Sequence, residues 1–395
     1  MQTKPKLRFK DKNGNAYPEW EENLLGDIGE LRNGIAKGCE FFGHGHKFIN
    51  LQDVFGKDCL YDNDYDLVET SEKERQLNDL KKGDVIFVRS SVKPSGVGLP
   101  SVVMEDLKDT VFSGFLIRFR EHKLCLNLLY KRYCFIVDSF RREVLKRSSS
   151  SANTNINQDN LANIKLKIPC LEEQEKIAGF LSKVDELINE CEGEVKDLEE
   201  QKKGLMQKIF SQQIRFKDSN NNPYPDWEEK YVNEVCDIST GKGNTQDKED
   251  NGIYPFYVRS AIIERSNKYI FDGEAVLTVG DGVGTGKVYH YVNGKFNFHQ
   301  RVYKMSNFNG ILGKYFYYYF STHFYDRVKK MTAKTSVDSV RLEMISKMTL
   351  LIPCQEEQEK IAKVLSKMDE LIEEKKALLI DLQQFKKGLL QQMFV

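Results

Sequence analysis

Long apolar runs, paired cysteines and net charge are all missing from this sequence. No apolar run reaches 18 residues, which excludes an ordinary transmembrane helix, and Met1–Lys10 contains no apolar signal core. We therefore expect a cytoplasmic protein with no membrane partner. The eight cysteines are scattered without a C-x-x-C pair, which argues against a disulfide scaffold. Basic and acidic residues number 59 each, so the 395-residue chain is not a uniformly basic DNA coat.

Motifs of catalysis and metal binding are incomplete. A Phe-x-Gly-x-Gly sequence at 41–45 is typical of S-adenosylmethionine enzymes, but no apolar strand precedes it. Residues 280–287 end in Gly-Lys but lack the first glycine and the Ser or Thr of a P-loop. These residues form either a flexible loop or a loop whose backbone comes close to a polyanion. In the second case Lys287 would contact a phosphate. Irregular spacing argues against a zinc site formed by Cys39, His44, His46 and Cys59. None of these motifs defines a catalytic, metal or cofactor site.

An internal repeat organises the chain. Ile168–Phe210 aligns without gaps on Ile352–Phe394, and 26 of the 43 positions are identical. A second repeat pairs Leu7–Glu22 with Ile214–Glu229, and both copies contain Tyr-Pro-x-Trp, which we interpret as a structural clasp. The predicted domains are an N-terminal block 1–22, a first variable domain 23–160, a helical spacer and connector 161–229, a second variable domain 230–347 and a second helical spacer 348–395.

Each helical spacer shows the 4-3 apolar spacing of a coiled coil over about five heptads. Proline precedes each predicted helix and acidic residues occupy its first turn, as is typical of helix starts. We predict two long helices that pair antiparallel within the chain; the alternative is two independent surface helices. The predicted seam comprises Ile177, Leu181, Val184, Ile188, Val195, Leu198, Ile361, Leu365, Met368, Ile372, Leu379 and Leu382.

The variable domains have the pattern of mixed α/β structure. Strands are predicted at 84–89, 111–119, 274–279 and 287–292, and helices at 124–146 and 311–330. The fold class is therefore α+β, with two pseudo-repeated mixed domains separated by the two long helices. The N-terminal block should pack near the end of the second helix, because its repeat copy follows the first helix.

Charge is segregated along the chain. Glu172–Glu200 holds eleven acidic residues against three basic ones, whereas 123–150 and 314–347 are each basic. Because Arg and Lys neutralise phosphates and Arg, Asn and Gln read base edges, these clusters favour nucleic-acid binding over an ordinary solvated surface. The predicted DNA contacts are Arg89, Ser90, Ser91, Lys93, Arg118, Arg120, Arg141, Arg142, Lys146, Arg147, Asn153 and Asn155 in the first domain, and Lys242, Asn244, Gln246, Arg259, Lys287, Lys329, Lys330 and Lys334 in the second.

The whole chain resembles the specificity subunit of type I restriction-modification enzymes. The resemblance rests on the twofold arrangement, the Tyr-Pro-x-Trp blocks, the heptad helices and Ile-Pro followed by Glu-Gln-x-x-Ile at 168–177 and 352–361. It implies that each variable segment is a target-recognition domain that reads one half of a bipartite site on double-stranded DNA. It also implies that the helices set the gap between the half-sites.

The resemblance further implies that the chain itself is non-catalytic, that it holds no metal and no cofactor, and that it has protein partners. Two methylation subunits carrying S-adenosylmethionine would dock on the helices, and two restriction subunits would bring ATP and magnesium chemistry. Two alternatives stay open from the residues alone: a stand-alone DNA methyltransferase, and a coiled-coil scaffold protein without a DNA role.

Overall fold

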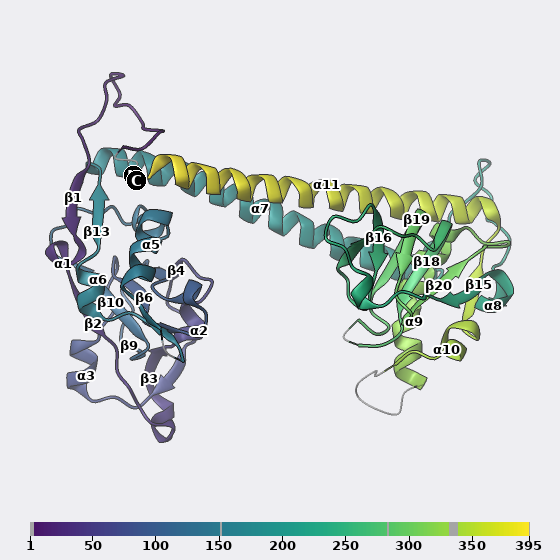
Figure 1. Cartoon of the computed structure of the whole chain (residues 1–395), viewed down its shortest axis with the longest axis horizontal. Helices are drawn as coiled ribbons and strands as arrows, with labels where there is room; N and C mark the ends of the chain where they lie inside the picture. The colour runs from purple at the N-terminus through teal and green to yellow at the C-terminus, as the bar shows by residue number, and fades with distance from the viewer. Residues whose placement is uncertain (1–3, 151, 283, 332–338, 395) are drawn as a thin grey trace. The chain divides into compact units, whose positions relative to one another are not determined.

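The computed structural model describes residues 4–150, 152–282, 284–331 and 339–394, and the chain divides into two compact units. Unit 1 comprises Met1–Cys191 with Leu378–Val395, and unit 2 comprises Glu192–Ala377. Each unit combines helices with β-sheets, so the α+β class is confirmed (Figure 1). Among the described residues, no helix is long and apolar enough to cross a membrane.

Unit 1 is built around a five-stranded sheet of order β2-β10-β6-β8-β4. The central strand β6 is buried at every residue, in keeping with its sequence Val-Ile-Phe-Val. The smaller sheets are the pair β1-β13 and two three-stranded sheets of order β11-β12-β7 and β5-β3-β9. The elements are β1 (Glu21–Leu24), α1 (Leu25–Ile28), β2 (Gly29–Asn33), β3 (Phe42–Ile49), α2 (Leu51–Val54), β4 (Cys59–Leu60), β5 (Asp66–Val68), α3 (Glu72–Leu77), β6 (Val85–Val88), β7 (Ser90–Ser91), β8 (Pro100–Val103), β9 (Thr110–Phe112), β10 (Leu116–Glu121), α4 (Lys131–Cys134), α5 (Asp138–Arg147), β11 (Ser149–Ser150), β12 (Thr154–Asn155), α6 (Gln158–Ala162) and β13 (Lys165–Ile168).

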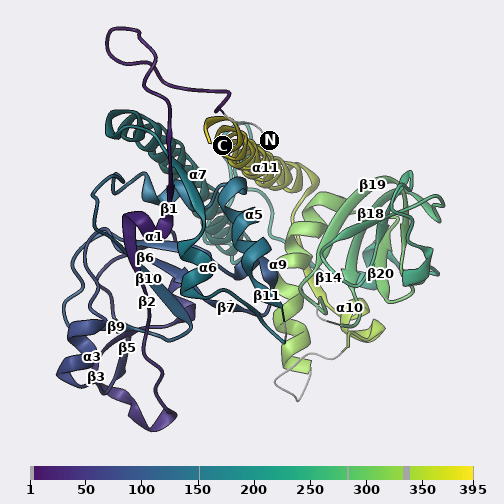
Figure 2. The same ribbon diagram turned by 60° about the vertical axis from the view of Figure 1, so that its left-hand side comes forward.

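Unit 2 contains a six-stranded sheet of order β15-β20-β18-β19-β16-β17, and β14 pairs with β21. The aromatic helix α9 packs on this sheet and buries Tyr315, Phe316 and Phe320 in the core of the unit (Figure 2). The elements are β14 (Glu228–Tyr231), α8 (Val232–Val235), β15 (Asp237–Thr240), β16 (Tyr254–Tyr257), β17 (Ile263–Ser266), β18 (Phe271–Val279), β19 (Tyr289–Phe298), β20 (Val302–Ser306), α9 (Gly313–Met331), α10 (Leu342–Ser346) and β21 (Thr349–Ile352).

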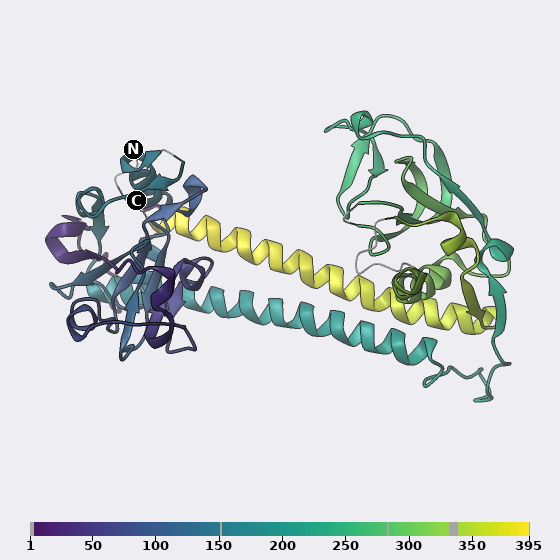
Figure 3. The ribbon, with the colours of Figure 1, turned by 90° about the horizontal axis from the view of Figure 1, so that it is seen from below.

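The two predicted long helices are α7 (Leu171–Phe210) and α11 (Gln355–Met393), and residues of both occur in each unit (Figure 3). Within unit 2, Lys375 pairs with Glu194 while Lys202 pairs with Asp369, so the helices run antiparallel there. Within unit 1, Lys386 pairs with Asp185 at 2.5 Å. Every predicted seam residue is buried or half-buried, and the antiparallel pairing is confirmed.

A buried carboxylate joins the N-terminal block of unit 1 to the start of α7. The Glu173 side chain is fully buried; it accepts two hydrogen bonds from Arg8, at 3.0 and 2.7 Å, and one from the Trp20 indole at 3.1 Å. The hydrogen bond to Glu173 raises the pKa of Arg8. The next residue, Gln174, accepts from the backbone N–H of Asn127 and donates to the Cys125 carbonyl. The N-terminal block is therefore bound to Glu173, and the variable domain is bound to the neighbouring Gln174.

Unit 2 repeats this arrangement. The Glu357 side chain, also fully buried, accepts from Arg215 at 3.2 and 2.7 Å and from the Trp227 indole at 3.0 Å. Gln358 accepts from the Leu312 N–H, as its counterpart does in unit 1.

The chain connection differs between the two clasps. The clasp block of unit 2 follows α7 directly, and Ile214 N–H donates to the Lys208 carbonyl at 3.1 Å. In unit 1 the same bond joins two ends of the chain, because Leu7 N–H donates to the Gln392 carbonyl at 3.0 Å. The predicted contact of the N-terminal block with the end of the second helix is confirmed.

Two predicted elements are wrong in detail. The strand expected at 111–119 is two strands, β9 and β10, separated by a turn at 113–115. The helix expected at 124–146 is reduced to α4 and α5, because Val137 adopts an extended conformation and interrupts it. The strands expected at 84–89, 274–279 and 287–292 and the helix at 311–330 are present with shifted ends.

The two clasps predict different consequences for the same mutation. Arg8→Ala should leave Glu173 buried and unpaired, at a cost of about 3 kcal/mol, and should release the N-terminal block. Limited proteolysis should then cleave the chain before Trp20. Arg215→Ala is the matched control, because it removes the equivalent ion pair but its block stays covalently held on both sides. Equal protection of the N-terminal block in wild type and Arg8→Ala would show that the clasp does not hold it.

A half-buried histidine, His290, should make unit 2 sensitive to acid. The His290 ring packs 4.9 Å from the Tyr257 ring, and its Nε2 has no hydrogen-bond partner within the described ranges. Burial lowers the pKa of His290 to about 4. An unfolded histidine titrates near pH ~6.5, so the unfolded state binds the proton more tightly.

This depressed pKa predicts the pH dependence of stability. The contribution of neutral His290 should be complete above pH ~6.5 and should be lost as the pH falls toward 4, by about 1–3 kcal/mol. His290→Gln should therefore lose less stability than wild type between pH 7 and pH 4.5 in thermal or urea unfolding. Parallel pH profiles of the two proteins would contradict the assignment.

Candidate nucleic-acid interface

Two of the arginines predicted to contact DNA belong to the fold of unit 1. Arg118 is 3% exposed and donates to Asp79 Oδ1 at 3.0 Å and to the Asp79 carbonyl at 2.6 Å. Arg120 donates to Asp79 at 2.9 Å and to Asp84 at 2.6 Å. Because these guanidinium groups are committed to neighbouring carboxylates, we withdraw Arg118 and Arg120 from the predicted DNA contacts.

The polar stretch around 149–155 also has a structural role. Ser90 and Ser91 form β7 and are buried, and β12 pairs with them through Asn155 and Thr154. Asn155 donates to the carbonyl of Asn153. We withdraw the two serines as well, because their side chains are covered by the sheet.

Exposed cations of unit 1 remain on α5 and on the loop after β7. Arg141 is half-buried and donates to the Ser95 carbonyl at 2.9 Å, and Arg147 is tied to Glu143. Lys93, Arg142 and Lys146 are exposed, and the Lys146 side chain is 76% exposed beside Glu143 at 3.7 Å. Among the predicted cations of unit 1, these three are the most accessible to phosphates.

At one end of the main sheet, the same backbone hydrogen bonds occur in both units, and we call this arrangement the shared frame. In unit 1, Gly34 N–H donates to the Leu116 carbonyl and Arg89 N–H to the Phe115 carbonyl, at 3.2 and 2.8 Å. In unit 2, Gly241 N–H donates to the Val302 carbonyl and Gly280 N–H to the Arg301 carbonyl, at 3.3 and 2.8 Å.

The glycines of this frame permit a close backbone approach. A Cβ atom at Gly34 would lie 2.1 Å from the Phe112 carbonyl oxygen, and one at Gly241 would lie 2.1 Å from that of Phe298. Two equivalent three-residue turns are thereby positioned, at 113–115 and 299–301. Their side chains differ completely: Ser-Gly-Phe in unit 1 and His-Gln-Arg in unit 2.

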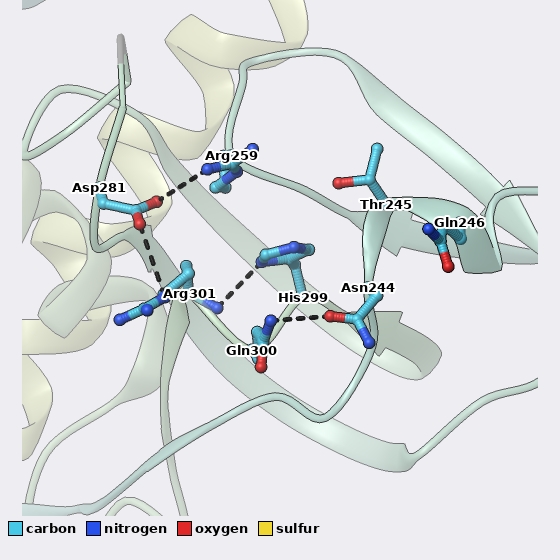
Figure 4. Close-up of a pocket in the computed structure, with 8 residues that line it drawn as sticks. All are labelled: Asn244, Thr245, Gln246, Arg259, Asp281, His299, Gln300 and Arg301. Atoms are coloured by element: carbon cyan, nitrogen blue, oxygen red, sulfur yellow. Dashed lines mark hydrogen bonds and ion pairs between the residues drawn. The ribbon is translucent and has the colours of Figure 1, made fainter.

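In unit 2 this turn lines a polar cavity of about 560 Å³. The predicted residues Asn244, Gln246 and Arg259 line it too (Figure 4). The lining residues that sequence reasoning missed are Thr245, Asp281, His299, Gln300 and Arg301. Loops from four parts of the domain therefore bring amide, guanidinium and carboxylate groups together.

Asp281 lies between two arginines in this cavity (Figure 4). Its carboxylate is 3.7 Å from Arg259 and 3.6 Å from Arg301, distances that are ionic rather than hydrogen-bonded. The side chains of the two arginines are 50% and 65% exposed. Both guanidinium groups are therefore held near one charge while keeping N–H donors for a ligand.

A neutral histidine forms part of the cavity wall. His299 is 4% exposed, and its Nδ1 accepts from the Arg301 backbone N–H at 3.0 Å, which places the ring proton on Nε2. Burial and the charge of Arg259 lower the pKa of His299. Beside it, Gln300 Nε2 donates to Asn244 Oδ1 at 2.7 Å. The cavity thus presents hydrogen-bonding edges as well as charge.

Four other predicted cations of unit 2, Lys242, Lys287, Lys329 and Lys330, do not line this cavity. Lys242 is exposed on the loop after β15. Lys287 and Lys329 both lie over the Tyr325 ring, at 5.2 and 4.8 Å, and Lys330 is exposed at the end of α9. Lys334 lies outside the described residues.

Only some of these unpredicted lining residues could have been found from a sequence pattern. His299-Gln300-Arg301 is a polar trio that interrupts two apolar strands, a pattern that marks a turn with exposed side chains. Asp281 stands out in the sequence only because it occupies the place of the first glycine of a P-loop. The described residues contain no group of three or more His, Cys, Asp or Glu positioned for a metal ion.

Comparisons with known proteins agree with this architecture. The family model described as "Type I restriction modification DNA specificity domain" matches twice, at residues 17–200 and 224–384. The Type I restriction enzyme MjaVIII specificity subunit of Methanocaldococcus jannaschii is 26% identical over 299 residues, covering 68% of this chain and 70% of that protein. The putative MjaX specificity subunit of the same organism is 24% identical and covers 92% of this chain and 90% of that protein.

A solved structure shows the same fold. The S subunit of a type I restriction-modification system from M. genitalium aligns with a TM-score of 0.61 and 14% identity, covering 99% of each chain. The two matches of the family model cover most of the sequence. Each match includes one variable domain and most of one long helix, α7 or α11. The chain belongs to the type I restriction-modification DNA specificity family.

Proposed function

We propose that this chain is the DNA-recognition subunit of a type I restriction-modification complex, in which each variable domain reads one half of a bipartite target. The observation that carries the proposal is the shared sheet edge with different side chains at 113–115 and 299–301. A common frame presents each turn in the same way, while the side chains differ. Such an arrangement suits two separate DNA sequences better than two copies of one.

We also propose that the chain is non-catalytic and that methylation subunits dock beside the helix pair. A cavity of about 330 Å³ in unit 1 is lined by Asp185, Asn189 and Lys386, among others. Unit 2 has a cavity of about 660 Å³ lined by the repeat-equivalent residues Asp369 and Glu373, among others. Two equivalent surfaces support two partner copies. S-adenosylmethionine, ATP and magnesium would then be carried by methylation and restriction subunits.

The two alternatives have less support. A stand-alone methyltransferase is opposed by the incomplete motifs at 41–45 and 280–287. A scaffold without a DNA role is opposed by the family match and by the arginine- and amide-lined cavity of unit 2.

Methylome sequencing tests the proposed function directly. A host that expresses the chain with its cognate methylation subunit should gain a split adenine-methylation motif that is absent without the chain. Exchanging residues 23–160 for the same segment of another family member should change one half of the motif. The gap should stay constant, because the helices are unchanged. An assembled complex that produces no split motif would refute the proposal.

Salt dependence separates phosphate contacts from structural arginines in unit 1. Lys93→Ala should reduce the slope of log affinity against log salt by about 0.9 for duplex DNA, because one released counterion is lost. Arg120→Ala should leave that slope unchanged at temperatures where the protein is folded, but should lower the melting temperature, because it breaks a buried ion pair. Filter binding or fluorescence anisotropy from 50 to 200 mM salt gives the slopes. If Arg120→Ala reduced this slope more than Lys93→Ala does, Arg120 rather than Lys93 would be the phosphate contact.

A further inference from the structure

The cavity at the 299–301 turn contains two distinct recognition chemistries in one place. One is the hydrogen-bonded amide pair Gln300 and Asn244, and the other is Arg301 beside Asp281. Both belong to loops rather than to the packed core, and both face the same cavity of about 560 Å³ (Figure 4).

The amide pair has a defined pattern of free groups. The bond between Gln300 and Asn244 uses one carbonyl and one N–H of the pair. Whichever amide is the donor, one carbonyl oxygen and one NH₂ group are left for a ligand. In the DNA major groove, adenine presents one donor and one acceptor, N6–H and N7, whereas guanine presents two acceptors. The pair therefore complements adenine.

Arg301, in contrast to the amide pair, suits guanine. Its side chain is 65% exposed, and its Nε comes no closer than 3.6 Å to Asp281, so its donors are oriented but remain available. Planar guanidinium groups bind guanine O6 and N7 in a bidentate manner. Asp281 Oδ1 has no hydrogen bond to any described residue. The carboxylate thus acts on both arginines through charge, as a positioning residue.

We propose that the His299–Arg301 turn, with Asn244 and Asp281, is the base-reading element of the second recognition domain. Gln300 and Asn244 read an adenine in the major groove, and Arg301, positioned by Asp281, reads a guanine. His299 supports the turn through its bond to the Arg301 backbone. This inference rests on the proposed function and deepens it, because it names the residues that define one half of the target.

The equivalent turn of unit 1 explains why the two halves need not match. Its residues Ser113, Gly114 and Phe115 occupy the same frame, and the Arg89 guanidinium donates to the Gly114 carbonyl at 3.0 Å. The Phe115 side chain is 55% exposed. An aromatic ring in place of Arg301 offers no hydrogen bond to a base, so the half-site read by unit 1 should be defined differently.

The test is methylome sequencing of the assembled complex containing Gln300→Ala, Arg301→Ala or Asp281→Asn. Gln300→Ala should relax one adenine position in one half-site, with discrimination falling about 5- to 150-fold. Arg301→Ala should relax a guanine position in the same half. Asp281→Asn should relax that guanine position too, which a purely structural residue would not do selectively. The other half-site should stay intact in every variant, which also shows that the complex has folded.

Lys268→Ala is the control, since it removes an exposed cation of unit 2 that does not line the cavity. It should leave both half-sites unchanged. If complexes with Gln300→Ala and Arg301→Ala methylate the wild-type motif with the same base selectivity at every position, the inference is wrong while the proposed function stands. A wild-type complex that methylates without a split motif would instead remove the proposed function, and the inference with it.

Discussion

The buried carboxylates of Glu173 and Glu357 are the constraint on which the rest of the structure depends. An ionised group without solvent is costly unless it is paired and hydrogen-bonded, so each of them fixes an arginine and an indole in place. Each is followed by a buried glutamine that holds the loop of its own variable domain. Two connections therefore meet in the first turn of each long helix: one to the clasp block and one to the recognition domain.

The repeated clasp explains how the protein can keep a fixed frame while its recognition residues vary. The clasp and the seam fix the ends of each variable domain, and glycine at 34 and 241 allows the same close packing of the sheet edge. The hydrogen bonds that the two units share in this frame are all between backbone groups, so they do not involve the side chains at 113–115 or 299–301. The sequence between the anchors can change, provided that the apolar strands and these glycines remain.

Sequence reasoning succeeded where the signal is periodic or repeated. The seam, the clasp and the antiparallel helices follow from heptad spacing and from 26 identities in 43 positions, because both patterns reflect local geometry. It failed where long-range contacts decide. The turn at 113–115 is set by hydrogen bonds to residues 34–35 and 89, far away in sequence. Asp281 and Arg301 meet only through the pairing of β18 with β20, so no spacing rule could join them.

The prediction of individual DNA contacts shows why a count of basic residues is a poor guide. An Arg–Asp–Arg arrangement occurs twice: Arg118, Asp79 and Arg120 in unit 1, and Arg259, Asp281 and Arg301 in unit 2. In the first, donor–acceptor distances of 2.9 to 3.0 Å and burial consume the guanidinium donors, so the group stabilises the fold. In the second, distances of 3.6 to 3.7 Å and exposed side chains leave the donors available. The same three residue types thus stabilise the fold in one domain and, in our proposal, serve recognition in the other. The deciding variable is the distance to the shared carboxylate, which only the folded structure supplies.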